Sequence, residues 1–192
     1  MWNVISHRRR NFAVFSFYTP LYAEGAKRLS ASLDALRIPH EIEPLPDTGD
    51  WVKNCAMKPE FILRKWLNTS VRVVWVDADA VIHSEPYLFT RLDTDMAAHW
   101  RSDKRYTNEL LSGTLFFNRT DGARRILEAW AKRMKEVSDE WDQRTLADIV
   151  HSMDSISLYR LPASYTQIFD TMADRGKPVI EHFQRSRAVK NA

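Results

Sequence analysis

Val71-Arg72-Val73-Val74-Trp75-Val76-Asp77-Ala78-Asp79 is the stretch that decides the fold we expect. Its first six residues are almost all apolar, and most are β-branched or aromatic, which is typical of a strand buried on both faces of a parallel sheet. Asp77 and Asp79 follow directly, so this strand carries two carboxylates at its C-terminal end. Because open α/β sheets bind their ligands beyond the carboxyl ends of the strands, the stretch predicts a site as well as a central strand.

Strands and helices are expected to alternate on both sides of this central strand. The apolar run Phe12–Phe17 predicts a buried first strand, and the helix after it has apolar residues on one face from Tyr22 to Leu36, ending before Pro39. Further strands are expected at 41–45, 96–100, 114–117, 157–159 and 179–180. Further helices are expected at 51–67, with Pro59 opening the second part, at 120–134 and after residues 141–143. This alternation predicts an α/β fold, a three-layer α/β/α sandwich with a mainly parallel sheet.

Length and composition favour one globular domain over residues 1–192. The chain is 44% hydrophobic and 11% aromatic, which is enough for a real core, and it shows no repeat or linker-like segment. Its single cysteine, Cys55, excludes an internal disulfide and a cysteine-rich zinc site. The N-terminus lacks the apolar stretch of a signal peptide, and no run of about 18 apolar residues occurs, so we expect no membrane span and a cytoplasmic location.

The chain is mildly basic, with 28 lysines and arginines against 25 acidic residues, a net charge of +3 and a pI of about 9.0. Ordinary solubility explains such a bias. The basic run Arg8-Arg9-Arg10 and the tail from Arg185 to Lys190 would also suit a polyanionic partner. A non-catalytic nucleic-acid-binding module accounts for these two segments but leaves the aspartates at the strand end unexplained.

Asp77 and Asp79 are the first candidate metal ligands. Two aspartates one residue apart, where a strand turns into a loop, can converge on one divalent cation, and their hard oxygen atoms favour Mg²⁺ or Mn²⁺. Such an ion would bridge the phosphates of a nucleotide sugar and neutralise the charge on the departing diphosphate. Asp-x-Asp also occurs by chance in surface loops, so the triplet alone does not identify the site.

The same triplet fits the first motif of haloacid dehalogenase-like phosphatases, in which the first aspartate is the nucleophile and the second a general acid. Those enzymes complete their Mg²⁺ site with a later acidic pair, commonly Gly-Asp-x-x-x-Asp or Asp-Asp. Neither spelling occurs after position 79, so the phosphatase is the weaker interpretation.

The order of several motifs resembles the nucleotide-diphospho-sugar transferases of the A-type glycosyltransferase fold, which is Rossmann-like. Phe17-Tyr18-Thr19 is similar to the segment on which those enzymes seat the nucleotide base, and Val74–Val81 is similar to their metal motif. Ser112-Gly113-Thr114-Leu115-Phe116-Phe117-Asn118 resembles their sugar-contacting strand, and Trp141-Asp142-Gln143 and His182 follow in the family's order. The resemblance spans nearly the whole chain and implies a glycosyltransferase with a nucleotide-diphosphate sugar as co-substrate.

The resemblance also implies roles for single residues. In glycogenin-like members the second aspartate and a late histidine bind the metal, while the first aspartate reaches the metal or the ribose. Here these roles fall to Asp79, His182 and Asp77. The other donor-binding candidates are Tyr18, Thr19, Ser112 and Gly113, and the candidates for catalysis are Asp142 and Gln143.

Ordinary structural interpretations compete with these roles. A lone histidine after a strand is more often a satisfied structural residue, and Asp142 could be an acid that favours a helix N-terminus. Gly113 could be a plain turn glycine rather than one that lets the backbone approach the sugar closely. Trp141, like the other six tryptophans, is expected in the core rather than at an acceptor platform.

Three basic residues are candidates for pairing with the diphosphate. Lys58, just before Pro59, could equally be a solvated lysine at a helix end. Arg187 and Lys190 follow His182 closely in the sequence, where a diphosphate would need positive charge. The family's usual C-terminal motif contains a lysine, with a glycine after the histidine, and this chain departs from it, so the resemblance does not fix the diphosphate contacts.

The resemblance favours a UDP-sugar donor and transfer with retention of the anomeric configuration, while the acceptor stays open. The small, basic chain resembles bacteriophage enzymes that decorate hydroxymethylated pyrimidines in DNA. In that case duplex DNA would be a partner and the protein would act in the host cytoplasm. Trp100 or Tyr106 would then stack on the target base. A polysaccharide or lipopolysaccharide acceptor is the alternative.

Overall fold

The structure, a computed structural model, describes residues 10–137 and 140–184, and the following elements lie in these ranges. The strands are β1 (Phe12–Tyr18), β2 (His40–Pro44), β3 (Arg72–Val76), β4 (Ala80–Ile82), β5 (Met96–Arg101), β6 (Glu109–Phe117), β7 (Leu158–Arg160), β8 (Gln167–Ile168) and β9 (Ile180–His182). The α-helices are α1 (Ala23–Ala35), α2 (Trp51–Ala56), α3 (Lys58–Asn68), α4 (Asp121–Glu136) and α5 (Asp142–Ser152). Short 3₁₀ helices lie at η1 (Pro20–Tyr22), η2 (Tyr87–Thr90), η3 (Ala163–Tyr165) and η4 (Ala173–Arg175).

The strands form a mostly parallel sheet in the order β2-β1-β3-β6-β5-β7 and a smaller sheet in the order β4-β9-β8. In the large sheet β1 runs parallel to β2 and β3, and β5 runs parallel to β7. β6 runs antiparallel to its neighbours β3 and β5. Because β6 is reversed, its first half lies at the same edge of the sheet as the carboxyl end of β3.

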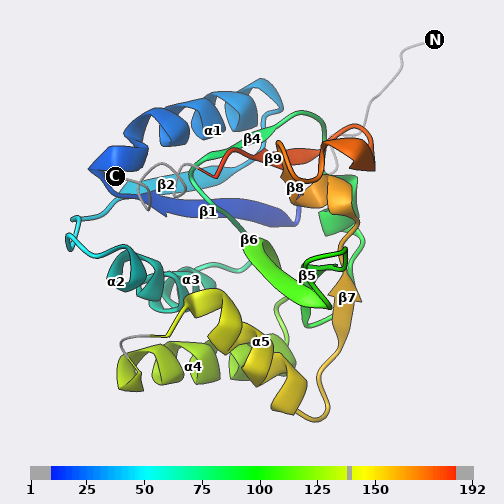
Figure 1. Ribbon diagram of the computed structural model, residues 1–192. Coiled ribbons are helices and arrows are strands. Elements are labelled where there is room, and N and C mark those ends of the chain that lie inside the picture. Colours follow the sequence, from blue (N-terminus) through cyan, green and yellow to red (C-terminus); the bar gives the residue numbers. More distant parts are fainter. Residues whose placement is uncertain (1–9, 138–139, 185–192) are drawn as a thin grey trace.

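Two apolar cores cover the two faces of the large sheet, which confirms the predicted three layers. Along β1, Ala13 and Phe15 point into the core beneath α3, α4 and α5, while Phe12 and Val14 point into the core beneath α1. This alternation is the period-2 pattern of a strand buried on both faces. In Figure 1, α1 lies on one side of the sheet and α3, α4 and α5 lie on the other.

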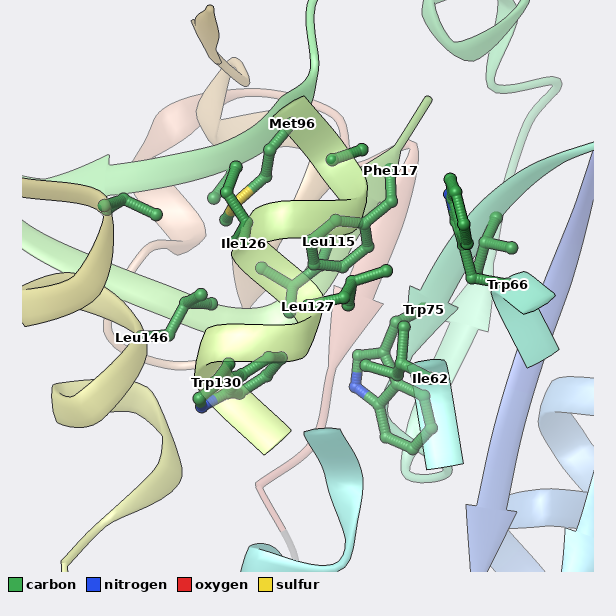
Figure 2. Packing of buried hydrophobic residues seen from close by; sticks show 14 of the residues in the cluster. Ile62, Trp66, Trp75, Met96, Leu115, Phe117, Ile126, Leu127, Trp130 and Leu146 are labelled. Carbon is green, nitrogen blue, oxygen red and sulfur yellow. The ribbon is translucent and has the colours of Figure 1, made fainter. Parts of the chain in front are cut away.

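Helix α4 supplies much of the core beneath α3, α4 and α5, which we call the first core. Thr120 caps its N-terminus by accepting a hydrogen bond from the N–H of Ala123 (3.2 Å). In Figure 2 the side chains of Ile126 and Leu127 lie beside the sheet residue Leu115. The cap and the apolar face together explain why this segment is helical and which way it faces.

The segment 51–67 forms the two helices α2 and α3, and Pro59 stands in the first turn of α3, as expected for a second part that opens at this proline. Two other local predictions differ from the structure. The strands β4 and β8 were not predicted, because segments of two or three residues have no usable periodicity. The last strand extends to His182, so this histidine lies within a strand rather than after one.

Within residues 10–137 and 140–184, no helix combines the length and the apolar character that a membrane crossing requires.

Trp130→Ala tests how much the packing of the first core contributes to the stability of the protein. Trp130 is fully buried on α4, and its indole Nε1 donates a hydrogen bond to the backbone carbonyl of Asp142 (3.0 Å). We expect the free energy of unfolding to fall by about 3–5 kcal/mol, since the change leaves a cavity. Urea denaturation measures the loss, and Leu67→Ala, at a residue that is 55% exposed, should stay within about 0.5 kcal/mol. Equal effects at both positions would contradict this packing.

Candidate functional site

A cleft opens beyond the carboxyl ends of β1 and β3, where the sequence predicted a site. It holds about 1010 Å³ of space between protein atoms, including space open to solvent at its mouth. Its walls come from the end of β1, from α2 and α3, from the loop after β3, from the first half of β6, from the start of α5 and from the β8–β9 region. Segments distant in sequence therefore meet here.

Asp77 and Asp79 stand in a tight turn between β3 and β4. The N–H of Asp77 donates to the carbonyl of Gly113 (2.9 Å), and the N–H of Ala80 donates to the carbonyl of Asp77 (3.1 Å). The indole Nε1 of Trp75 donates to Asp77 Oδ1 (2.8 Å). Asp79 is buried and Asp77 is half-buried, and both line the cleft. The turn thus holds two carboxylates in fixed positions at the cleft wall.

Strand β9 brings His182 to these two aspartates. β4 pairs antiparallel with β9, and Ala80 lies opposite His182 in the register. One ligand atom from each of Asp77, Asp79 and His182 lies within 4.8 Å of the others, and His182 Nδ1 is 4.0 Å from Asp79 Oδ1. The structure therefore places the three predicted metal ligands together.

Thr114 fixes the imidazole of His182 from the other side. Thr114 Oγ1 and His182 Nε2 share a hydrogen bond of 2.8 Å, and both residues are buried. When Nε2 donates this bond, the lone pair of Nδ1 faces Asp79. Burial lowers the pKa of His182, although Asp77 and Asp79 act to raise it. The neutral imidazole is thus favoured, and this is the form that binds metal ions.

Gly113 makes the space that the histidine ring occupies. A Cβ atom at position 113 would lie 3.0 Å from His182 Cε1 and 3.2 Å from His182 Nδ1. These contacts are tight, so a side chain here would make the ring shift by a few tenths of an ångström. Gly113 therefore leaves room for His182, in addition to any approach of the sugar.

Gly25 is a site-positioning residue that the sequence analysis missed. It lies in α1, and a Cβ atom there would be 2.8 Å from the carbonyl oxygen of Ala78 and 3.2 Å from the Cα of Asp79. Only a glycine lets α1 approach the Asp77–Asp79 turn this closely. The available signal was a glycine inside a well-patterned helix, where it is unfavourable by roughly 0.5–1 kcal/mol relative to alanine.

Lys58 joins several parts of the cleft through one buried ammonium group. Its Nζ lies 2.9 Å from Asp142 Oδ2 and 3.2 Å from Asp77 Oδ1, and it donates to Ser112 Oγ (3.2 Å). Burial alone would lower the pKa of Lys58, but Asp142 and Asp77 outweigh it and raise the pKa above its ordinary value. The interpretation of Lys58 as a solvated lysine at a helix end is therefore wrong.

Asp142 and Gln143, the candidates for catalysis, both face the cleft from the start of α5. Asp142 is 1% exposed, and its Oδ1 is buried with no hydrogen-bond partner in the part of the chain that the structure describes. Gln143 Oε1 accepts from the N–H of Ser112 (3.1 Å), and its Nε2 donates to Glu109 (3.2 Å). The interpretation of Asp142 as a helix-end acid does not explain a buried, unpartnered carboxylate oxygen inside the cleft.

Tyr18 and Thr19, the candidates for seating the base, line the cleft at the end of β1, and Thr19 is buried. Tyr22 also lines the cleft, although the sequence analysis used it only as a residue on a helix face. Burial first, and then Asp79, raise the pKa of Tyr22 to about 12, so it stays a neutral phenol. The candidates Arg187 and Lys190 lie outside the described residues.

The prediction of which aromatic residues lie near the site was wrong. Trp100 is buried in the first core and Tyr106 packs against Arg101, and neither is among the described residues that line the cleft. Trp141, expected in the core, is 41% exposed and lines the cleft together with Trp51. The sequence held a signal that the prediction did not use, since Trp100 follows the apolar run Met96-Ala97-Ala98 whereas Trp141 stands between Glu140 and Asp142.

Comparison with protein families gives one match. The sequence model of a nucleotide-diphospho-sugar transferase family matches residues 39–188. These residues include the Asp77–Asp79 turn, the first half of β6, the start of α5 and His182. No curated protein sequence matches the chain.

Solved structures share the fold. A glycosyltransferase involved in the glycosylation of the major capsid of PBCV-1 has a TM-score of 0.74 and 13% identity, over 94% of this chain and 96% of that chain. The bifunctional WbbM in its apo form has a TM-score of 0.64 and 12% identity, over 90% of this chain and 45% of that chain. GlyE of Streptococcus pneumoniae TIGR4 has a TM-score of 0.61 and 14% identity, over 89% and 54% of the two chains. At such identities the likeness shows the fold alone.

Gly25→Ala tests the close approach of α1 to the Asp77–Asp79 turn. We expect the change to destabilise the protein by about 1–3 kcal/mol, because the added methyl group meets backbone atoms that cannot move alone. At an unconstrained helix position the same change stabilises by roughly 0.5–1 kcal/mol. Urea denaturation shows whether the free energy of unfolding falls or rises. A more stable variant would show that the close approach of α1 to the Asp77–Asp79 turn does not constrain position 25.

Proposed function

Because the chain belongs to the nucleotide-diphospho-sugar transferase family, we propose that it transfers a sugar from a nucleotide-diphosphate sugar, preferably a UDP-sugar, to a hydroxyl acceptor with the help of Mn²⁺ or Mg²⁺. The observation that carries the proposal is the convergence of Asp77, Asp79 and His182, whose ligand atoms lie within 4.8 Å of one another beyond the end of β3. This edge of the sheet is where α/β folds bind their ligands.

The residues present fit a divalent metal ion. Two carboxylates and a neutral imidazole offer oxygen and nitrogen donors that suit Mn²⁺, and carboxylates also suit Mg²⁺. Thr114 holds the imidazole in the way that outer hydrogen-bond partners usually hold histidine ligands. When bound, the ion would supply positive charge against the diphosphate of the donor.

Other residues of the chain would bind the rest of the donor. Tyr18 and Thr19 would seat the nucleotide base at the end of β1. Lys58, beside Asp77, would add its ammonium charge against the diphosphate. Arg187 and Lys190, which lie outside the described residues, are the other basic residues that we propose for this role. Their charge would offset the negative charge that the leaving diphosphate develops.

Asp142 and Gln143 would act on the transferred sugar, together with Ser112 and Gly113. The unpartnered, buried Oδ1 of Asp142 is suited to accept a hydrogen bond from a sugar hydroxyl, because an empty acceptor in this position is otherwise unfavourable. Gln143 is held by Ser112 and Glu109, so its amide has a fixed orientation beside the sugar. We propose retention of the anomeric configuration, in keeping with the resemblance to glycogenin-like members, with the departing phosphate assisting the acceptor hydroxyl.

Two acceptor classes follow from the sequence. The basic composition supports a hydroxymethylated pyrimidine in phage DNA, and the alternative is a surface polysaccharide or lipopolysaccharide. Of the basic run at the N-terminus, Arg10 is engaged within the protein, in an ion pair with Glu85 (2.7 Å). Arg8 and Arg9 lie outside the described residues. The family assignment gives no support to the phosphatase interpretation or to a non-catalytic binding module.

Titration with nucleotides tests the donor site. We expect a nucleoside diphosphate, UDP before GDP or dTDP, to bind with Mn²⁺ at least roughly tenfold more tightly than without it, and Asp79→Ala to remove this difference. Isothermal titration calorimetry measures both, with circular dichroism as the check on folding. Asp174→Ala, at an acid whose side chain is 79% exposed, is the matched control and should bind like the unaltered protein. If the unaltered protein and both variants bind the nucleotide equally well without Mn²⁺, the three candidate ligands do not form a metal site that serves the donor.

Asp142→Asn tests the proposed contact with the transferred sugar. We expect the hydrolysis of UDP-sugars, in which water is the acceptor, to fall by roughly 100-fold because the sugar is no longer held correctly. The affinity for UDP, which lacks the sugar, should change far less. Asp148→Asn, an exposed position on the same helix, is the control. An equal loss of UDP binding and hydrolysis would mean that Asp142 only maintains the pocket.

A further inference from the structure

Trp51 and Trp141 form an aromatic platform at the mouth of the cleft. Trp51 begins α2 directly after the capping residue Asp50, and Trp141 directly precedes α5. Their ring centroids are 6.2 Å apart and the ring planes meet at 49°. Both residues line the cleft, and Trp141 is 41% exposed. A single exposed indole needs no explanation, but two adjoining indoles at a cleft mouth make a surface of defined shape.

The platform adjoins a residue that we proposed to contact the transferred sugar. Trp141 is the neighbour of Asp142, whose carboxylate is the proposed contact of the transferred sugar. Trp51 makes a side-chain hydrogen bond with Tyr22, toward the end of the cleft proposed for the base. The platform comes from the first residue of α2 and the residue before α5, whereas the candidate metal ligands come from the β3–β4 turn and β9. Trp141 therefore adjoins the proposed sugar contact, and the platform uses none of the residues that would hold the metal ion.

We propose that Trp51 and Trp141 are the acceptor subsite and that the acceptor is a glycan, whose pyranose ring packs its C–H face on the indoles. This inference rests on the proposed function. The C–H groups of a pyranose carry slight positive charge, and the face of an aromatic ring carries the negative part of its quadrupole. A tryptophan fixes only two side-chain angles on binding, so it provides a large contact at low entropic cost. The hydroxyl groups at the edge of the pyranose stay free to reach the donor.

Geometry and charge both favour a pyranose over a base extruded from duplex DNA. An extruded base is held between stacking side chains, and two rings at 49° form a bent platform rather than a flat slot. Duplex DNA is bound mainly through lysine and arginine contacts to phosphates. Within three residues of the two tryptophans in the sequence, the charged residues are Asp50, Lys53, Asp139, Glu140, Asp142 and Arg144, so four acidic residues stand against two basic ones.

Binding of simple glycosides tests the subsite. The probes are the methyl α- and β-pyranosides of glucose, galactose and mannose, each added to protein saturated with UDP and Mn²⁺ and observed by saturation-transfer difference NMR. We expect transfer to the C–H protons of one ring face, and Trp141→Ala should weaken the affinity by roughly tenfold or more. Trp141→Tyr should keep most of it, because a flat aromatic face is retained. Tyr87→Ala removes a 66% exposed aromatic residue of η2, away from the cleft lining, and should leave the signal as it is.

A duplex carrying 5-hydroxymethylcytosine is the competing probe, followed by fluorescence anisotropy. Three results would overturn the glycan subsite: no glycoside signal from protein that binds UDP, a signal that Trp141→Ala does not weaken, or duplex binding that depends on Trp141. Failure of the proposed function is seen separately, since it would appear as a lack of UDP binding in the unaltered protein with Mn²⁺ present.

Discussion

The buried ammonium group of Lys58 is the interaction on which the cleft depends. It ties α3 to the turn after β3, to β6 and to the start of α5 through Asp77, Ser112 and Asp142. A charge buried this deeply is tolerated only while its partners stay in place, since removal of one partner of a buried pair costs about 3–5 kcal/mol. The same contact therefore holds Asp77, which we propose to bind the metal ion, and Asp142, which we propose to contact the sugar, within reach of one cation.

Backbone pairing and two glycines set the other half of the site. The β4–β9 ladder places His182 opposite Ala80, immediately after the Asp77–Asp79 turn. Gly113 leaves room for the imidazole, and Gly25 lets α1 press against the turn from outside. None of these features would contact the metal ion, yet each restricts the positions that the candidate ligands can take. Such a shell of packing and hydrogen bonds is what holds a metal site to the geometry it needs.

The sequence predicted the fold and the main motifs because these depend on local patterns. The apolar run of β3 and the aspartates after it can be recognised in the sequence alone. The order of motifs shared with the nucleotide-diphospho-sugar transferases singles out Asp142 and His182. What could not be predicted depends on contacts between distant segments. Gly25 matters only because α1 meets the Asp77–Asp79 turn, and the buried position of Lys58 appears only when α3, β6 and α5 come together. The exposure of Trp141, by contrast, could have been predicted, because it stands between Glu140 and Asp142, whereas the buried Trp100 follows the apolar run Met96-Ala97-Ala98.

The start of α5 links the proposed donor and acceptor sites through covalent geometry. Trp141 is the extended residue directly before α5 and Asp142 is the first residue of the helix; Asp142 turns inward and is 1% exposed, while Trp141 turns outward and is 41% exposed. Trp130 holds this point from the core through its hydrogen bond to the carbonyl of Asp142. A sugar on Asp142 and a ring on Trp141 would thus be positioned by one anchored backbone segment. Group transfer is sensitive to misplacements of about 1 Å, so two substrates held from adjacent residues need less independent positioning than two held from separate loops.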